Sequence, residues 1–197
     1  MDKGRLEAFS DGVLAIIITI MVLELKAPRE PTLEALRPIV PVFLSYLLSF
    51  VYVAIYWNNH HHMLQATHRV NGLILWANMH LLFWLSLVPF TTAWMGENHF
   101  APVPTAAYGI VLLAAAIAYY LLQTTIIRDQ GEGSLLATAV SRDLKGKLSP
   151  FLYITGIVLC AVDARLSIAV YTVVALIWLI PDRRLERTIR ASAERVP

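Results

Sequence analysis

The apolar segments of this chain approach the length of a lipid bilayer, and this restricts the fold more than any other feature. A helix that crosses about 30 Å of hydrocarbon needs about 20 residues. Backbone groups inside a bilayer must be hydrogen-bonded within the segment, which favours helices. The sequence therefore predicts an all-α membrane protein with a single domain over residues 1–197 and six transmembrane helices, at roughly 7–26, 39–63, 70–95, 103–127, 148–164 and 166–181.

The composition supports a membrane protein and excludes several other classes. The chain is 57% hydrophobic and only 15% charged, whereas soluble domains carry about 25% charged residues. A net charge of +2 gives no reason to expect a nucleic acid partner. Cys160 is the single cysteine, so no intramolecular disulfide and no cysteine metal cluster can form. The first apolar run lacks the small-residue exit of a cleaved signal, and we expect it to be retained as a helix.

The distribution of Lys and Arg predicts the orientation. Twelve of the 16 fall in the N-terminus, the second and fourth connections and the tail 182–197. The other side holds only Lys26, Arg29, Arg37 and Arg165. Positively charged loops remain in the cytoplasm. We therefore expect a multi-pass protein of the cell (plasma) membrane with cytoplasmic N- and C-termini and a basic cytoplasmic tail.

Two further features shape the expected helices. Pro89 should kink the third helix, because its ring removes one backbone hydrogen bond. Asp163 and Arg165 mark a tight, solvated turn between the last two helices, which are short.

The first helix carries one distinctive face. At about 100° per residue, a stripe about 100° wide is charged at its tip, small at Gly12, and then apolar with one hydroxyl. The opposite face, with Leu14 and Met21, is plainly aliphatic. Periodicity does not decide which face is functional, since Thr19 can bond to its own helix and Gly12 can contact another helix. The stripe consists of Arg5, Phe9, Gly12, Ile16, Thr19, Ile20 and Leu23.

Asp11 needs a partner outside the first helix. It lies about 240° around the helix from Arg5, so the two cannot form a same-face pair. An unpaired charge near hydrocarbon is costly, and ionisable groups there indicate function. Its candidate partners lie on the second and third helices: Trp57, Asn58, His60, His61, Asn78 and His80. Such a cluster pins three helices together, a structural role that is compatible with a channel.

The run "WNNHHHMLQATHR" does not form a metal motif. Consecutive histidines on a helix point about 100° apart, so at most two can converge on one ion. No HExxH pattern accompanies them. We predict no metal site and no cofactor. A haem held axially by His60 and His80 is an alternative, but a single pair of histidines is weak support for it.

Three motifs resemble one known family. "RLEAFSDGVLAIIITIMVLEL" resembles the Arg-x-x-x-Phe-Ser-Asp-Gly signature of the transmembrane protein 175 family, which are potassium channels of lysosomes and endosomes with shorter prokaryotic relatives. "YWNNHHHM" is similar to the Trp-x-x-His end of the family's second helix. "LWANMHLLFWLSLVPFTTAW" is similar to its third helix. The resemblance covers roughly the first 95 residues, and beyond them only the hydropathy matches.

The resemblance implies a homotetramer of six-helix subunits that conducts K⁺ through a pore lined by the first helix. Ile16 would be the principal constriction, with Thr19 just beyond it, followed by Ile20 and Leu23. A polar network would support the pore helix through Arg5, Ser10, Asp11, Trp57 and His60. The sequence departs from the family pattern at Leu14, where Phe is frequent, and in the extra histidines 61 and 62.

The implied pore would select ions with side chains. The chain has no Thr-Val-Gly-Tyr-Gly segment, so we expect no re-entrant selectivity-filter loop. A ring of Ile16 side chains would exclude ions that hold their water tightly, and Glu24 would concentrate cations at the outer mouth. Three alternatives remain: a proton-conducting or proton-coupled carrier that uses Asp11 and the histidines, a haem enzyme, and a non-conducting scaffold. No nucleophile–base pair or phosphate loop supports an enzyme.

Overall fold

The computed structural model describes residues 2–131, 133–140 and 144–179. The basic tail predicted at 182–197 lies outside these residues. The chain is helical over most of the described part, and the helices are α1 (Lys3–Leu23), the 3-10 helix η1 (Glu34–Ile39), α2 (Val40–Gln65), α3 (Gly72–Ser86), α4 (Val88–Glu97), α5 (Pro102–Gln130), α6 (Leu135–Val140), α7 (Leu144–Leu159) and α8 (Ala164–Leu179).

Helix α1 begins one turn earlier than the apolar run predicts. The Asp2 side chain accepts a hydrogen bond from the Gly4 backbone N–H at 3.2 Å and caps the helix. Lys3 and Glu7 then form an i, i+4 pair at 3.7 Å on the first turn. Local capping therefore extends the helix beyond the segment that hydropathy identifies.

The interruption expected at Pro89 is present. Helix α3 ends at Ser86, α4 begins at Val88, and Pro89 lies in the first turn of α4. The Thr91 backbone N–H donates to the Leu87 carbonyl at 3.2 Å, so the ladder resumes directly after the break. Proline is tolerated there because a first-turn N–H has no intrahelical partner.

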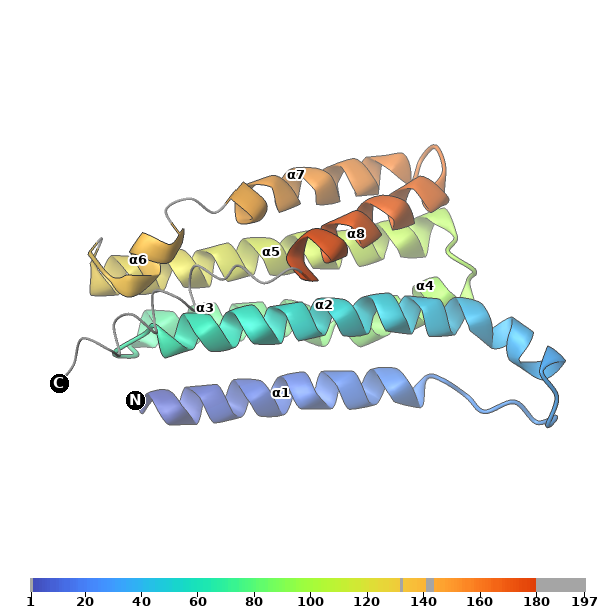
Figure 1. The fold of residues 1–197 in the computed structure, drawn as a ribbon, viewed down its shortest axis with the longest axis horizontal. Helices are drawn as coiled ribbons and strands as arrows, with labels where there is room; N and C mark the ends of the chain where they lie inside the picture. Colours follow the sequence, from blue (N-terminus) through green and yellow to red (C-terminus); the bar gives the residue numbers. More distant parts are fainter. Residues whose placement is uncertain (1, 132, 141–143, 180–197) are drawn as a thin grey trace.

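Helix α5 occupies the middle of the bundle. It packs against α3 and α4 on one side and against α7 and α8 on the other. Helix α1 contacts α2, α3 and α4 and forms the outermost layer opposite α7 (Figure 1). Within the part of the chain that the structure describes, α1 is thus packed on one side and exposed along the other.

Aromatic side chains and small residues hold α5, α7 and α8 together. Tyr52, Tyr108, Tyr153 and Tyr171 pack ring against ring in the core. A Cβ atom added at Gly109 or Gly156 would overlap Tyr171. The two glycines therefore allow the Tyr171 ring to lie between α5 and α7.

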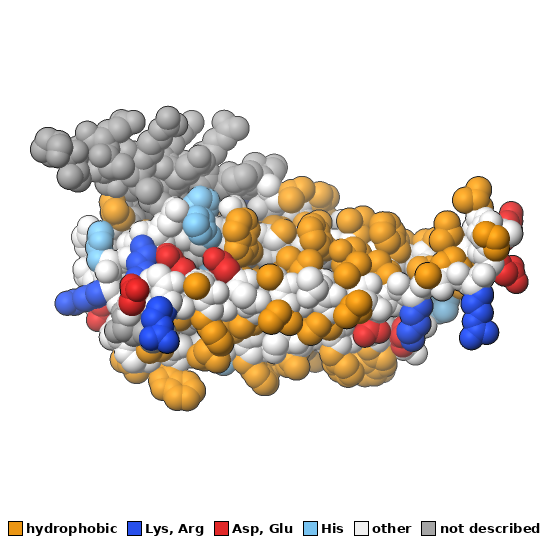
Figure 2. Space-filling model, turned by 90° about the horizontal axis from the view of Figure 1, so that it is seen from below, with side chains coloured by type: hydrophobic (Ala, Val, Ile, Leu, Met, Phe, Trp, Pro, Cys, Tyr) orange, Lys and Arg blue, Asp and Glu red, His pale blue; other side chains and the backbone are white. Residues whose placement is uncertain are grey.

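The surface agrees with insertion in a bilayer. Hydrophobic side chains cover the middle of the face that Figure 2 shows, while Lys, Arg, Asp and Glu gather toward its two ends. Four segments are long and apolar enough to span a membrane, and they are Lys3–Leu23, Glu34–Gln65, Gly72–Glu97 and Pro102–Gln130. Helices α7 and α8, with 16 residues each, are about 24 Å long. The described chain is a multi-pass α-helical membrane protein.

Candidate functional site

Helix α1 turns two different faces to its surroundings. Its buried side consists of Leu6, Ser10, Leu14, Ile17 and Met21, which contact α2, α3 and α4. The distinctive stripe lies on the other side, where Ile16 is 58% exposed and Leu23 is 77% exposed. Every member of the stripe is exposed: Arg5, Phe9, Gly12, Ile16, Thr19, Ile20 and Leu23. The aliphatic face therefore anchors α1 to the described bundle, and the stripe lies on its exposed surface.

A buried chain of hydrogen bonds ties α1 to α3 and α2. Asn78 Nδ2 of α3 donates to Ser10 Oγ at 3.0 Å. The Asn78 carbonyl oxygen lies 2.7 Å from His60 Nε2 of α2. Ser10 Oγ in turn donates to the Leu6 carbonyl at 2.9 Å. Since Ser10, His60 and Asn78 are each at most 2% exposed, these bonds fix the position and rotation of α1 without competition from water.

A second tie joins α1 to α2 at the protein surface. Trp57 Nε1 donates to Asp11 Oδ1 at 3.0 Å. The Trp57 ring also stacks on His61, with ring centroids 5.8 Å apart. The carboxylate that the sequence left without a partner on its own helix therefore has one on the next helix.

The remaining predicted residues lie apart from these ties. Arg5 is exposed and makes no hydrogen bond or ion pair with any described residue. Thr19 Oγ1 donates to the Ile16 carbonyl at 2.9 Å. This bond uses the hydroxyl hydrogen, so the oxygen presents its lone pairs to the surroundings of the exposed face. Glu24 caps the C-terminus of α1 beyond the stripe.

The histidines are distributed among separate contacts. His60 is held by Asn78, and His80 Nε2 accepts a hydrogen bond from Trp84 Nε1 at 2.9 Å. His61 lies against Trp57 and His62. Among the described residues, no group of three or more His, Cys, Asp or Glu side chains converges on one point.

The residue that connects the network is Asn78. The sequence identified it only as one of several partners for Asp11, whereas it bonds to both Ser10 and His60. The signal was present, because a lone amide in the middle of an apolar helix must find a partner in the bundle. A second buried cluster, where Ser49 Oγ lies 2.6 Å from Thr92 Oγ1 and 3.0 Å from Tyr108 Oη, had no comparable signal.

The fold and the site define a polytopic helical membrane protein in which hydrogen bonds to α2 and α3 hold one helix, α1, at the surface of the bundle. A family model described as "Endosomal/lysosomal potassium channel TMEM175" matches residues 5–89. A potassium channel of Chryseobacterium sp. (strain P1-3) is 56% identical over 190 residues, which cover 96% of this chain and 99% of that protein. The chain belongs to the TMEM175 family, which consists of ion channels and not of enzymes.

Two further relatives differ from each other in length and in the ion that their names give. The crystal structure of a lysosomal potassium-selective channel TMEM175 homolog from Chamaesiphon minutus is similar with a TM-score of 0.78 and 32% identity, covering 89% of this chain and 95% of that one. The Gallus gallus protein named endosomal/lysosomal proton channel TMEM175 is 27% identical over 148 residues, which are 67% of this chain but 30% of that protein.

Proposed function

We propose that this protein is a potassium-selective channel in which four copies of one six-helix subunit surround a pore lined by α1. The observation that carries the proposal is the exposed stripe of α1, with Ile16 at its centre, in a chain 56% identical to a protein named a potassium channel. The polar ties at Ser10 and Asp11 support this role, because a pore helix must hold a fixed rotation to keep one face on the axis.

The proposed constriction selects by dehydration. Four Ile16 side chains form a narrow apolar ring, which an ion passes only after losing or deforming part of its water shell. K⁺ holds its water less tightly than Na⁺, so the ring favours K⁺. Thr19 lies next along the pore face, and its oxygen lone pairs replace part of the lost water because its hydrogen is bonded to the Ile16 carbonyl. Ile20 and Leu23 continue the apolar lining.

Six spans and cytoplasmic termini complete the proposal. Four of the spans meet the length of a bilayer, and α7 and α8 supply the fifth and sixth as a short pair joined at Asp163. The excess of Lys and Arg on the side of the N-terminus supports a cytoplasmic position for both termini, in the plasma membrane. The tetramer is what the family resemblance implies for a chain with one six-helix unit.

The test is ion flux in liposomes that contain the purified protein. We expect K⁺ efflux down its gradient and a smaller Na⁺ flux under the same gradient. The K⁺ flux should keep rising with K⁺ concentration, whereas the flux through a carrier would saturate. Cross-linking of the same preparation should end at a four-subunit species. A protein that assembles but passes neither ion would contradict the proposal.

Proton conduction is the second candidate, because the Gallus gallus relative is named a proton channel. Asp11 is the carboxylate on α1 outside the Lys3–Glu7 pair, and His61 of α2 stacks on its partner Trp57. A pH-sensitive dye inside K⁺-free liposomes distinguishes the two. Proton entry without K⁺, removed by Asp11→Asn, would favour this candidate, whereas K⁺ flux that survives Asp11→Asn favours the first.

A further inference from the structure

A cavity lies inside the subunit, on the far side of the bundle from the α1 stripe. It opens between α2, α5, α7 and α8 and has a volume of about 90 Å³. Helix lengths explain it: α5 has 29 residues and α7 has 16, so α7 is about 20 Å shorter. Because α7 begins partway along α5, α6 is the described helix that lies beyond its first turn (Figure 1), and Val140 of α6 lines the cavity.

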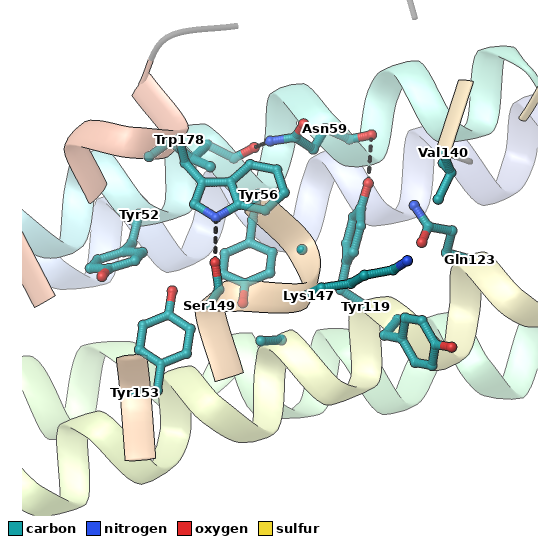
Figure 3. A pocket seen from close by; sticks show the side chains of 14 residues that line it. Tyr52, Tyr56, Asn59, Tyr119, Gln123, Val140, Lys147, Ser149, Tyr153 and Trp178 are labelled. Carbon is teal, nitrogen blue, oxygen red and sulfur yellow. Dashed lines mark hydrogen bonds between the residues drawn. The ribbon is translucent and has the colours of Figure 1, made fainter. Parts of the chain in front are cut away.

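The two ends of the cavity differ in chemistry. One end is aromatic and lies deep in the bundle, where Tyr52, Tyr56 and Tyr153 line it. Lys147 and Gln123 lie together at the other end of the cavity (Figure 3). This end is nearer the end of the bundle at which α1 begins and α5 ends (Figure 1). The cavity therefore has an apolar interior and one cationic end.

Hydrogen bonds hold the walls in place. Trp178 Nε1 of α8 donates to Ser149 Oγ of α7 at 2.8 Å. Tyr119 Oη of α5 donates to the Asn59 carbonyl of α2 at 3.3 Å. These bonds use the polar groups of Trp178 and Tyr119 and leave their rings toward the cavity (Figure 3). The cavity thus offers a preformed aromatic surface to an apolar ligand.

The position of Lys147 at one end of the cavity indicates that the ligand carries a negative charge there. It is exposed, and no described carboxylate lies within ion-pair distance of its ammonium group. It lies toward the end of the bundle that also carries Lys3 and Arg69, and cationic side chains at a membrane surface attract anionic lipids. The volume is below the ~300–1,000 Å³ of pockets for drug-sized ligands. It corresponds to about three water molecules at ~30 Å³ each, so it suits a short segment of an apolar chain and not a whole lipid tail.

We propose that this cavity holds a short segment of one acyl chain of a membrane phospholipid whose anionic head group lies at Lys147. The chain lies against the tyrosines between α2 and α5, and the phosphate meets the ammonium group at the membrane surface. The lipid segment lies between α2, α5 and α7 and joins α7 and α8 to the rest of the subunit. This role concerns a surface remote from α1 and stands independently of ion selectivity.

Quenching of tryptophan fluorescence by brominated lipids tests the proposal on the full chain. The protein is placed in nanodiscs of phosphatidylcholine that contain a small fraction of phosphatidylglycerol, with bromine on the acyl chains of one lipid or the other. The signal of Trp178 is the difference between the wild type and Trp178→Phe. We expect brominated phosphatidylglycerol to quench this signal at least twofold more than brominated phosphatidylcholine at the same mole fraction.

Two pairs of variants separate this site from general contact with lipid. Lys147→Gln should bring the ratio of quenching by the two lipids close to one, whereas Lys145→Gln, the same charge change on the same helix outside the cavity lining, should leave it unchanged. Ala116→Leu, which fills the cavity from α5, should reduce quenching of Trp178 by both lipids, and Ala114→Leu should not.

Three results would overturn the proposal. One is equal quenching by the two lipids in the wild type, and another is an equal loss in Lys147→Gln and Lys145→Gln. The third is quenching of Trp178 that appears only after removal of residues 182–197, which would show that the chain's own end occupies the cavity.

Discussion

The Asn78 side-chain amide of α3 donates a 3.0 Å hydrogen bond to Ser10 Oγ of α1 inside the bundle, and both residues are fully buried. Ser10 lies on the side of α1 opposite the stripe. A bond at this position therefore determines which residues of α1 point away from the subunit. It links a polar contact in the core to the geometry of the proposed pore.

Replacement of Asn78 by Leu tests the importance of this bond for stability. The change keeps the side-chain size but leaves the Ser10 hydroxyl and His60 without their shared partner. Buried polar groups without a partner are costly, although hydrogen bonds in membrane proteins are individually modest, so we expect a loss of about 1–2 kcal/mol. Reversible unfolding in mixed micelles measures it. Asn98→Leu is the control, because Asn98 is exposed and its side-chain amide donates to the Trp94 carbonyl at the end of the same helix. An equal loss there would contradict the role of Asn78.

The surface tie between Trp57 and Asp11 should contribute less. Its carboxylate is charged, but Trp57 is 44% exposed, and solvent screens the interaction. A double-mutant cycle with Trp57→Phe and Asp11→Asn should give a coupling energy of about 0.5 kcal/mol between the two side chains. A coupling energy of zero in the unfolding assay would show that the hydrogen bond contributes nothing to stability.

Asp11 should matter more for assembly than for ion selectivity. It lies outside the stripe, and its bond to Trp57 aligns α1 with α2. We therefore expect Asp11→Ala to reduce the yield of tetramer in size-exclusion chromatography while the assembled fraction keeps the wild-type ratio of K⁺ to Na⁺ flux. A tetramer formed in full yield with a shifted ratio would contradict this assignment.

The sequence predicted most of the membrane helices, and the differences have local physical causes. Hydropathy placed α2, α5 and the α3–α4 break at Pro89 to within a few residues. It missed the first turn of α1, which the Asp2 cap adds. It placed α7 about four residues late, because the polar residues before Pro150 mask a helix that begins at Leu144.

The site was predictable to different degrees. Helical periodicity divided α1 into the stripe and an aliphatic face, but it did not decide which of the two the bundle would bury. It could not find the partner of each polar residue, because pairing depends on how α2 and α3 are rotated against α1. Asn78 could be recognised as a polar group that needed a partner, but not as the bridge between Ser10 and His60.

The close packing of α5 against α8 predicts that Gly109→Ala is destabilising. A Cβ there would overlap Tyr171 Oη and lie 2.9 Å from Ile157 Cγ1. Overpacking of this kind costs about 1–3 kcal/mol, which unfolding in micelles should show. Tyr171→Phe in the same chain removes the nearest atom and should restore part of the loss. Gly72→Ala, with no neighbour within 4 Å, should be close to neutral, and a loss as large as that of Gly109→Ala would contradict the packing argument.

Replacement of Ile16 by Asn tests the proposed constriction directly. Ile16 is 58% exposed on the stripe and does not belong to the buried side of α1. Four amides in place of four aliphatic side chains would hydrate the ring, so ions would pass with more of their water. Single-channel recording should show a higher conductance, and reversal potentials under K⁺ and Na⁺ gradients should show a reduced preference for K⁺. Ala15→Asn is the matched control, because Ala15 is the exposed neighbour on α1 outside the stripe. If the preference for K⁺ is unchanged in Ile16→Asn, or is lost equally in Ala15→Asn, the ring of isoleucines does not determine the selectivity of the channel.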